Sequence, residues 1–113
     1  MRDHSKLTLR NQSDFVRVYN KGDSKGSMYV VVLYRKNNFE YSRTAFVASK
    51  KVGNSVNRNR ARRLMKAAYS NLKSQITAGY DIVFVARNTI AEQSEMDVEK
   101  AMYGAVKAAG LLN

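Results

Sequence analysis

The chain has 113 residues, no cysteine and a formal net charge of +11. This length suits one domain, residues 1–113, and the missing thiols exclude disulfides and cysteine-based zinc sites, which fits the cytoplasm. No apolar run is long enough for a membrane span or a secretory signal. The charge is concentrated, because residues 41–80 carry nine basic and no acidic side chains. This patch predicts a polyanionic partner, and no small-molecule substrate is expected.

The first predicted helix extends from about Asn11 to Lys21, where Gly22 ends it. Phe15 and Tyr19 are four residues apart and therefore share a face. Their spacing fits core packing, and it also fits an exposed aromatic edge that stacks on unpaired bases.

Two strands are predicted in the next part of the chain. Asp23–Ser27 is expected to be a turn-rich loop, followed by a strand over Met28–Tyr34 that is apolar on both faces. A second strand is predicted over Arg43–Ser49. The polar segment Arg35–Ser42 between them indicates an antiparallel hairpin with a long loop.

A basic helix is predicted from about Val56 to Gln75, with Asn54 or Ser55 as its N-cap. Its core-facing stripe contains Ala61, Leu64, Met65, Ala68 and Leu72. The periodicity places Arg60 at the flank of this stripe. The opposite, polar side contains Arg58, Asn59, Arg62, Arg63, Lys66, Tyr69 and Lys73.

The charges of this helix are all of one sign. Arg58, Arg62 and Lys66 follow each other at i, i+4 spacing, where like charges repel. A solvated helix face usually mixes signs, whereas an arginine-rich face suits bidentate contacts to phosphates. The sequence therefore favours a nucleic-acid-binding helix over a merely solvated one.

A third strand and a last helix complete the predicted elements. Tyr80–Ala86 has an unbroken apolar centre, which predicts a strand buried on both faces and joined in parallel through the basic helix. The last helix begins near Ser94, which forms a capping-box-like pair with Asp97. Its expected core stripe contains Val98, Ala101, Met102, Ala105, Val106 and Ala109.

The residues of a protein active site are missing. His4 is the only histidine, and there is no phosphate-binding glycine loop. Asp81 could pair with one of the acidic residues between Glu92 and Glu99, but no spacing supports it. If the chain takes part in a reaction, another component supplies the reactive centre.

Three segments resemble the protein component of bacterial ribonuclease P. The run SKKVGNSVNRNRARRL, residues 49–64, resembles the family's signature, in which the end of a strand is followed by the start of a basic helix. The run SDFVRVY, residues 13–19, with Gly22, and the run DIVFVAR, residues 81–87, are similar to two further family motifs. The first match is specific, and the other two are weak alone.

The resemblance implies an α/β fold, an α+β two-layer sandwich in the order α-β-β-β-α-β-α. Its third early strand would be a split of the first long run or a pairing of Arg35–Ser42. The resemblance also implies a left-handed crossover through the arginine-rich helix, against the usual right-handed rule.

The resemblance further implies a function in removing the 5′ leader from precursor tRNA. The catalyst would be the RNA subunit with Mg²⁺ held mainly by that RNA, and no metal or catalytic residue is expected in this chain. Phe15, Tyr19 and an aromatic of the first strand would line a cleft for the leader, with Tyr34 favoured over Leu33. Residues expected at the RNA subunit are Lys50, Lys51, Asn54, Arg58, Asn59, Arg60, Arg62, Arg63 and Lys66.

Two other classes of protein share the charge pattern. A structural ribosomal or general RNA-binding protein would have the basic helix but no need of an aromatic cleft. A DNA-binding helix is a weaker alternative, because no dimerisation seam lies beside the basic residues.

Overall fold

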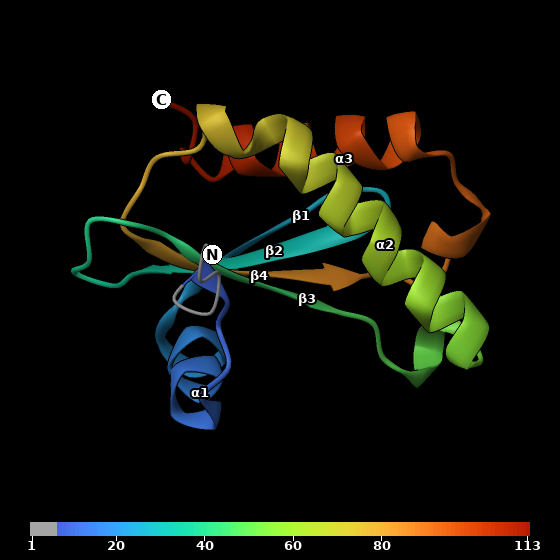
Figure 1. The fold of residues 1–113 in the computed structure, drawn as a ribbon, viewed down its shortest axis with the longest axis horizontal. Coiled ribbons are helices and arrows are strands. Elements are labelled where there is room, and N and C mark those ends of the chain that lie inside the picture. The colour runs from blue at the N-terminus through green and yellow to red at the C-terminus, as the bar shows by residue number, and fades with distance from the viewer. Residues whose placement is uncertain (1–6) are drawn as a thin grey trace, which may run out of the picture.

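The computed structural model describes residues 7–113, which form a four-stranded sheet with helices on both faces (Figure 1). His4 and the polar segment 1–6 lie outside the described residues. The order α-β-β-β-α-β-α is confirmed. The elements are α1 (Gln12–Lys21), β1 (Asp23–Gly26), β2 (Val30–Lys36), β3 (Arg43–Val47), α2 (Ser55–Leu72), β4 (Tyr80–Ala86) and α3 (Glu95–Ala108).

The sheet has the strand order β1-β2-β4-β3. β3 and β4 are parallel, which confirms the predicted connection through the basic helix. The predicted hairpin between the first two apolar strands is wrong, because β4 lies between them and pairs antiparallel with β2. β4 is the strand with the most buried residues, and the central place in the sheet covers both of its faces.

The third early strand is β1, in the segment predicted to be a loop. It pairs antiparallel with β2, with Asp23 opposite Tyr34. All four of its residues are exposed, so backbone hydrogen bonds rather than an apolar pattern define this strand. The apolar run is not split, and of Arg35–Ser42 only Arg35 and Lys36 pair in the sheet, as the end of β2 rather than as a separate strand.

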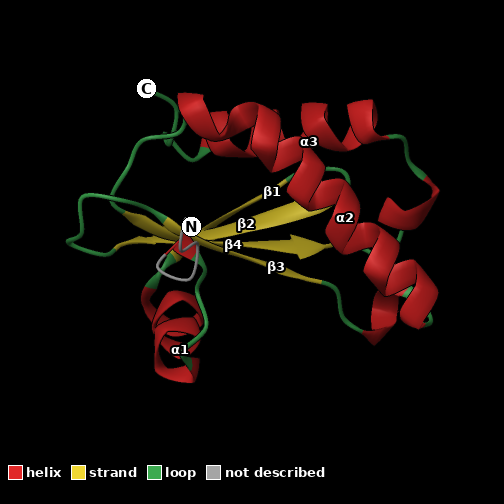
Figure 2. Ribbon diagram, in the orientation of Figure 1, coloured by secondary structure: helices red, strands yellow, loops and turns green. Residues whose placement is uncertain are grey.

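The helices divide unequally between the two faces of the sheet (Figure 2). α2 and α3 cover one face, and both predicted core stripes are largely confirmed. Their fully buried residues are Ala61, Met65, Ala68, Leu72, Val98, Met102, Ala105 and Val106. α1 lies on the other face, where Val18 packs with Leu9, Ala45 and Val83. None of the helices in residues 7–113 is long and apolar enough to cross a membrane.

Local signals place the helix ends. The Asn54 side chain accepts a hydrogen bond from the amide of Asn57 at 3.0 Å, and Ser94 accepts one from Asp97 at 3.1 Å. Gly22 ends α1 at a point where two backbone carbonyl groups leave no room for a side chain. A Cβ there would lie 2.5 Å from the carbonyl oxygen of Val18 and 2.7 Å from that of Tyr34, so only glycine fits without a shift.

An ion-pair cluster attaches α1 to the sheet. The Arg43 guanidinium of β3 donates two hydrogen bonds to Asp81 of β4, at 2.8 and 2.6 Å. It donates a third to Asp14 of α1 at 3.2 Å, and the Phe39 ring lies 4.9 Å from its central carbon. The hydrogen bonds to Asp81 raise the pKa of Arg43 above its usual value. One cation thus connects three elements.

Replacing Arg43 by methionine should lower the free energy of unfolding by about 2–4 kcal/mol, because the buried Asp81 would lose its cation and Asp14 would lose one of two. The measurement is urea denaturation followed by circular dichroism. Arg17→Ala is the matched control, since Arg17 also pairs with Asp14 but its side chain is 49% exposed. A change below about 1 kcal/mol is expected for the control. Equal effects of the two substitutions would contradict the assigned role of Arg43.

Candidate nucleic-acid interface

The basic face of α2 is not neutralised by the protein itself. Within residues 7–113, the ion pairs join only Asp14 and Asp81 to Arg17 and Arg43. The basic residues of α2 therefore have no carboxylate partner in that part of the chain. Arg58 and Arg62 are half-buried, and Asn59, Arg63 and Lys66 are exposed. Their repulsion at i, i+4 spacing is left for an external anion to relieve.

Arg60 differs from the other arginines of α2. Its Nε donates a hydrogen bond to the carbonyl of Ala91 at 2.8 Å, and one terminal nitrogen approaches the carbonyl of Gln93 at 3.4 Å. Arg60 thereby holds the turn before α3 against α2, which matches its predicted place at the flank. Arg62, by contrast, donates only to Asn59 on its own helix.

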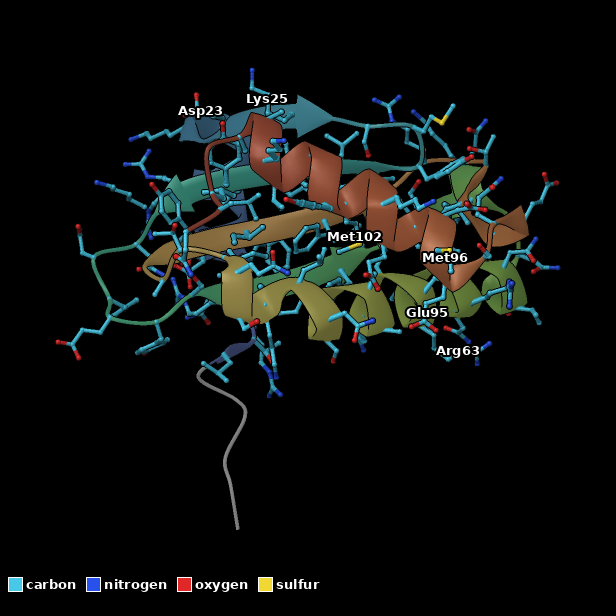
Figure 3. The ribbon with its side chains drawn as sticks, turned by 90° about the horizontal axis from the view of Figure 1, so that it is seen from above. Asp23, Lys25, Arg63, Glu95, Met96 and Met102 are labelled. Carbon is cyan, nitrogen blue, oxygen red and sulfur yellow. The ribbon has the colours of Figure 1, made fainter. Side chains whose placement is uncertain are left out.

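The acidic start of α3 limits the basic surface on one side. Arg63 and Glu95 lie close together (Figure 3) and line the same shallow hollow, without an ion pair within 4 Å. Further along, Glu99 accepts a hydrogen bond from Asn71 at 2.7 Å. The least compensated side of α2 is therefore the side that faces β3.

Phe15 and Tyr19 form an aromatic pair on α1. Their ring centroids are 6.5 Å apart with planes 21° from parallel. Phe15 is half-buried and packs against the apolar cluster under α1, whereas Tyr19 is 49% exposed. Phe15 thus contributes to the core, and the exposed Tyr19 ring extends the apolar surface into solvent.

The aromatic and basic sites meet at the open edge of the sheet. Phe15 of α1 and Lys66 of α2 line one hollow of about 320 Å³ along β3. The chain before α1 covers only the start of this edge, where the Leu9 amide donates to the Thr44 carbonyl at 2.9 Å. Alternation along a strand directs the backbone groups of Phe46 to the same edge, and no partner for them lies within residues 7–113.

The choice of Tyr34 for the aromatic surface is wrong. Tyr34 packs with the core under α2 and α3, and its ring centroid is 6.5 Å from that of Tyr80. Leu33 is the residue of β2 that packs with Phe15 on the α1 face. Successive strand residues face opposite sides of a sheet, so a register one residue off reverses the assignment.

The α1 face of the sheet continues beyond α1 as a shallow trough. Val47 and Val85 are half-buried there, and a hollow of about 690 Å³ begins at Val85 and includes Lys51 and Arg87. Lys51 was predicted from the sequence, and Arg87 was not. The signals for Arg87 were its place directly after the third apolar strand and its position at the end of the run DIVFVAR.

The remaining predicted residues lie at the beginning of α2. Lys50 and Lys51 are exposed in a short 3-10 turn before the helix. Asn54 is also exposed, but its side-chain oxygen is engaged as the N-cap. The structure thus places Lys50 and Lys51 in the turn that leads into α2, the helix that carries the i, i+4 row of Arg58, Arg62 and Lys66.

No carboxylate cluster is available for a metal ion in the described part of the chain. Within residues 7–113, no group of three or more His, Asp or Glu side chains is close enough to hold one. The two buried carboxylates, Asp14 and Asp81, already pair with Arg43. These residues therefore do not fit a resident metal centre.

Comparisons with known proteins agree on one family. The family model described as Ribonuclease P matches residues 4–110. A protein of Clostridioides difficile (strain 630), named ribonuclease P protein component, is 43% identical over 100 residues, covering 88% of each chain. A protein of Alkaliphilus oremlandii with the same name is 37% identical, covering 93% of this chain and 92% of its own.

Solved structures with similar folds carry related names. The structure of a Staphylococcus aureus RNase P protein mutant with defective mRNA degradation activity has a TM-score of 0.88 at 26% identity, covering 96% of this chain and 92% of its own. The RNase P protein from Thermotoga maritima has a TM-score of 0.77 at 31% identity, covering 86% and 92%. The similarity extends over nearly the whole fold.

Arg60 and Arg62 of α2 should respond differently to substitution. Arg62→Ala should weaken binding to a structured RNA by about tenfold, through the loss of a charged contact, and change the free energy of unfolding by less than about 0.5 kcal/mol. Arg60→Ala should lower that free energy by about 1 kcal/mol, because Arg60 holds the turn before α3. Filter binding and urea denaturation measure the two quantities. A larger loss of stability in Arg62→Ala than in Arg60→Ala would contradict this division.

Proposed function

The chain belongs to the ribonuclease P protein family and is the protein subunit of that endoribonuclease, and we propose that it binds RNA with two surfaces. The basic row of α2 binds the catalytic RNA, and the edge of β3 with the trough beyond α1 binds the 5′ leader of precursor tRNA. The observation that carries this proposal is the hollow shared by Phe15 and Lys66. It combines an aromatic ring, a cation and an open strand edge.

The first surface acts through charge. α2 presents cations that the described residues leave without carboxylate partners, and RNA phosphates supply the missing anions. Binding this chain would reduce the repulsion between phosphates that must approach each other around the reaction site. Catalysis is assigned to the RNA partner, with Mg²⁺ bound mainly by that RNA in the cytoplasm.

The second surface is suited to an unpaired strand. Bases stack on aromatic rings without regard to sequence, and α1 offers Phe15 and Tyr19 as such a platform. Val47 and Val85 provide an apolar floor, and Lys51 and Arg87 provide cations at its end. A leader of variable sequence requires this kind of tolerant contact.

A general RNA-binding protein would share the charge but not this combination. The aromatic pair and the trough would contact the leader, which precursor tRNA carries and mature tRNA lacks. These contacts would allow the protein to distinguish the two. The family match supports the same conclusion.

Reconstitution tests the proposal directly. The purified chain, added to ribonuclease P RNA and precursor tRNA at low Mg²⁺, should stimulate cleavage at the 5′ end of the mature tRNA. If about six phosphates are neutralised, log affinity for the RNA subunit should fall against log salt with a slope of about −4 to −5. The RNA alone is the control. Absence of stimulation, or binding that is nearly independent of salt, would overturn the proposal.

Replacing Phe15 and Tyr19 together by leucine should reduce the preference for leader-bearing over mature tRNA by at least about fivefold, since each stacked base contributes about 1–3 kcal/mol. Leucine keeps the apolar contacts of Phe15 while removing the ring. Tyr34→Leu, on the opposite face of the sheet, is the matched control and should retain the preference. Affinities of the holoenzyme for both substrates provide the measurement. An unchanged preference in the double variant would remove α1 from the leader surface.

A further inference from the structure

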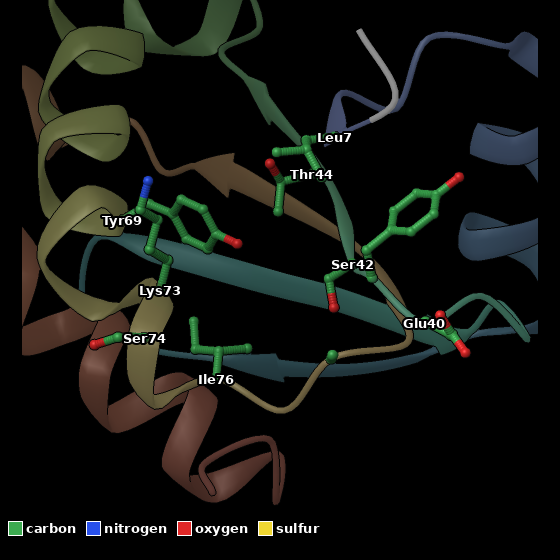
Figure 4. Close-up of a pocket in the computed structure, with 10 residues that line it drawn as sticks. Leu7, Glu40, Ser42, Thr44, Tyr69, Lys73, Ser74 and Ile76 are labelled. Carbon is green, nitrogen blue, oxygen red and sulfur yellow. The ribbon is translucent and has the colours of Figure 1, made fainter. Parts of the chain in front are cut away.

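A further hollow lies on the α2 side of the sheet, where the end of α2 passes the beginning of β3 (Figure 4). Its volume is about 410 Å³, and its lining includes Glu40, Thr44, Tyr69 and Lys73. Thr44 also borders the hollow of Phe15 and Lys66. The segment before α1 separates the two, because Leu7 lines one hollow and Thr8 lines the other.

Two hydroxyl groups line this hollow without a partner in residues 7–113. Thr44 is only 8% exposed, yet no hydrogen bond of its side chain to that part of the chain occurs. The Tyr69 hydroxyl likewise has no partner there, and Figure 4 shows it directed into the hollow. No fully buried side-chain polar atom in that part of the chain lacks a partner, so these two hydroxyls open onto the hollow, where a ligand can reach them.

The Tyr69 ring packs on the side of α2 that faces the sheet, contrary to the prediction from helical periodicity. The periodicity put it on the polar side, but its ring packs against Phe46 and Phe84, with centroids 5.7 and 5.6 Å apart. Burial raises the pKa of Tyr69, so its hydroxyl remains a hydrogen-bond donor at neutral pH. The position of this donor is therefore set before any ligand binds.

The charges at the two ends of the hollow are opposite. Figure 4 shows Lys73 and Glu40 on opposite sides, and no ion pair joins them. Lys73 follows Lys66 by seven residues, about two helical turns, and so continues the basic row of α2. A matching ligand is anionic at one end and carries N–H donors at the other. A nucleotide with an amino-bearing base has this polarity, and the volume suits a ligand of that size.

We propose that the hollow of Glu40, Thr44, Tyr69 and Lys73 binds one unpaired RNA nucleotide whose base carries an amino group. The phosphate contacts Lys73, the amino group donates to Glu40, and the two hydroxyls bind the ribose or the base. This site lies on the opposite face of the sheet from the trough beyond α1. Its existence does not depend on leader binding by Phe15 and Tyr19.

Titration of the isotope-labelled full chain with nucleoside 5′-monophosphates tests the site by NMR. CMP should shift the amide signals of Thr44, Tyr69 and Lys73, whereas UMP and inorganic phosphate should bind at least about fivefold more weakly. Thr44→Val and Tyr69→Phe each remove one hydroxyl with little change of shape, and each should weaken CMP binding by about two- to tenfold. Lys107→Ala, a basic residue of α3, is the matched control. Unchanged CMP affinity in a folded variant that carries both Thr44→Val and Tyr69→Phe would overturn the site. Shifts of amide signals confined to α1 would overturn it as well.

Two further binding measurements identify the RNA that supplies the nucleotide. Weaker binding of the Thr44→Val, Tyr69→Phe double variant to the RNA subunit alone would assign the nucleotide to that RNA. A loss that occurs only with precursors of increasing leader length would assign it to the leader. Wild-type affinity in both arms would overturn the assignment to RNA. The Phe15 and Tyr19 variant, measured in parallel, separates failure of the leader surface from failure of this site.

Discussion

The connection between Arg43 and two buried carboxylates determines how much of the sheet remains accessible. α1 is attached through Asp14 and a small apolar cluster rather than through a long apolar stripe. It therefore covers one end of its face and leaves Val47 and Val85 half-buried beyond it. A helix that buried this face completely would stabilise the fold further but would remove the surface on which an unpaired strand can lie. The ion-pair cluster thus gives α1 a fixed position without extending its coverage.

Charge and aromatic surface come from opposite faces of the sheet and meet at one strand. β3 is an edge strand, so side chains from α1 below and α2 above reach the same hollow. The order of strands is decisive here. If β3 had paired with β2 as a hairpin, β4 would have occupied an outer position, and Phe15 and Lys66 would not be expected at one edge. The parallel pairing of β3 with β4 is therefore part of the interface as much as of the fold.

The sequence predicted those features that repeat locally along the chain. Periodicity identified the buried faces of α2 and α3, and side chains able to cap identified where both helices begin. The sequence could not identify β1, because its four residues are exposed and backbone hydrogen bonds alone hold it in the sheet. It also could not decide between Leu33 and Tyr34, because both faces of that strand are apolar and only the packing of α1 distinguishes them. The pairing of Arg43 with Asp14 and Asp81 joins residues 29 and 38 positions apart, and no local pattern contains it.

The open edge of β3 has a consequence for the concentrated protein. Unpaired amide and carbonyl groups on an edge strand are a template for a strand from another molecule, which is a common route to aggregation. Here the row of cations on α2 lies beside that edge, so a second copy of the chain would bring the same charges into close approach. High salt weakens such repulsion. Colloidal stability of the RNA-free subunit should therefore decline as ionic strength rises. A bound polyanion would neutralise the cations, and it would instead protect the edge by covering it.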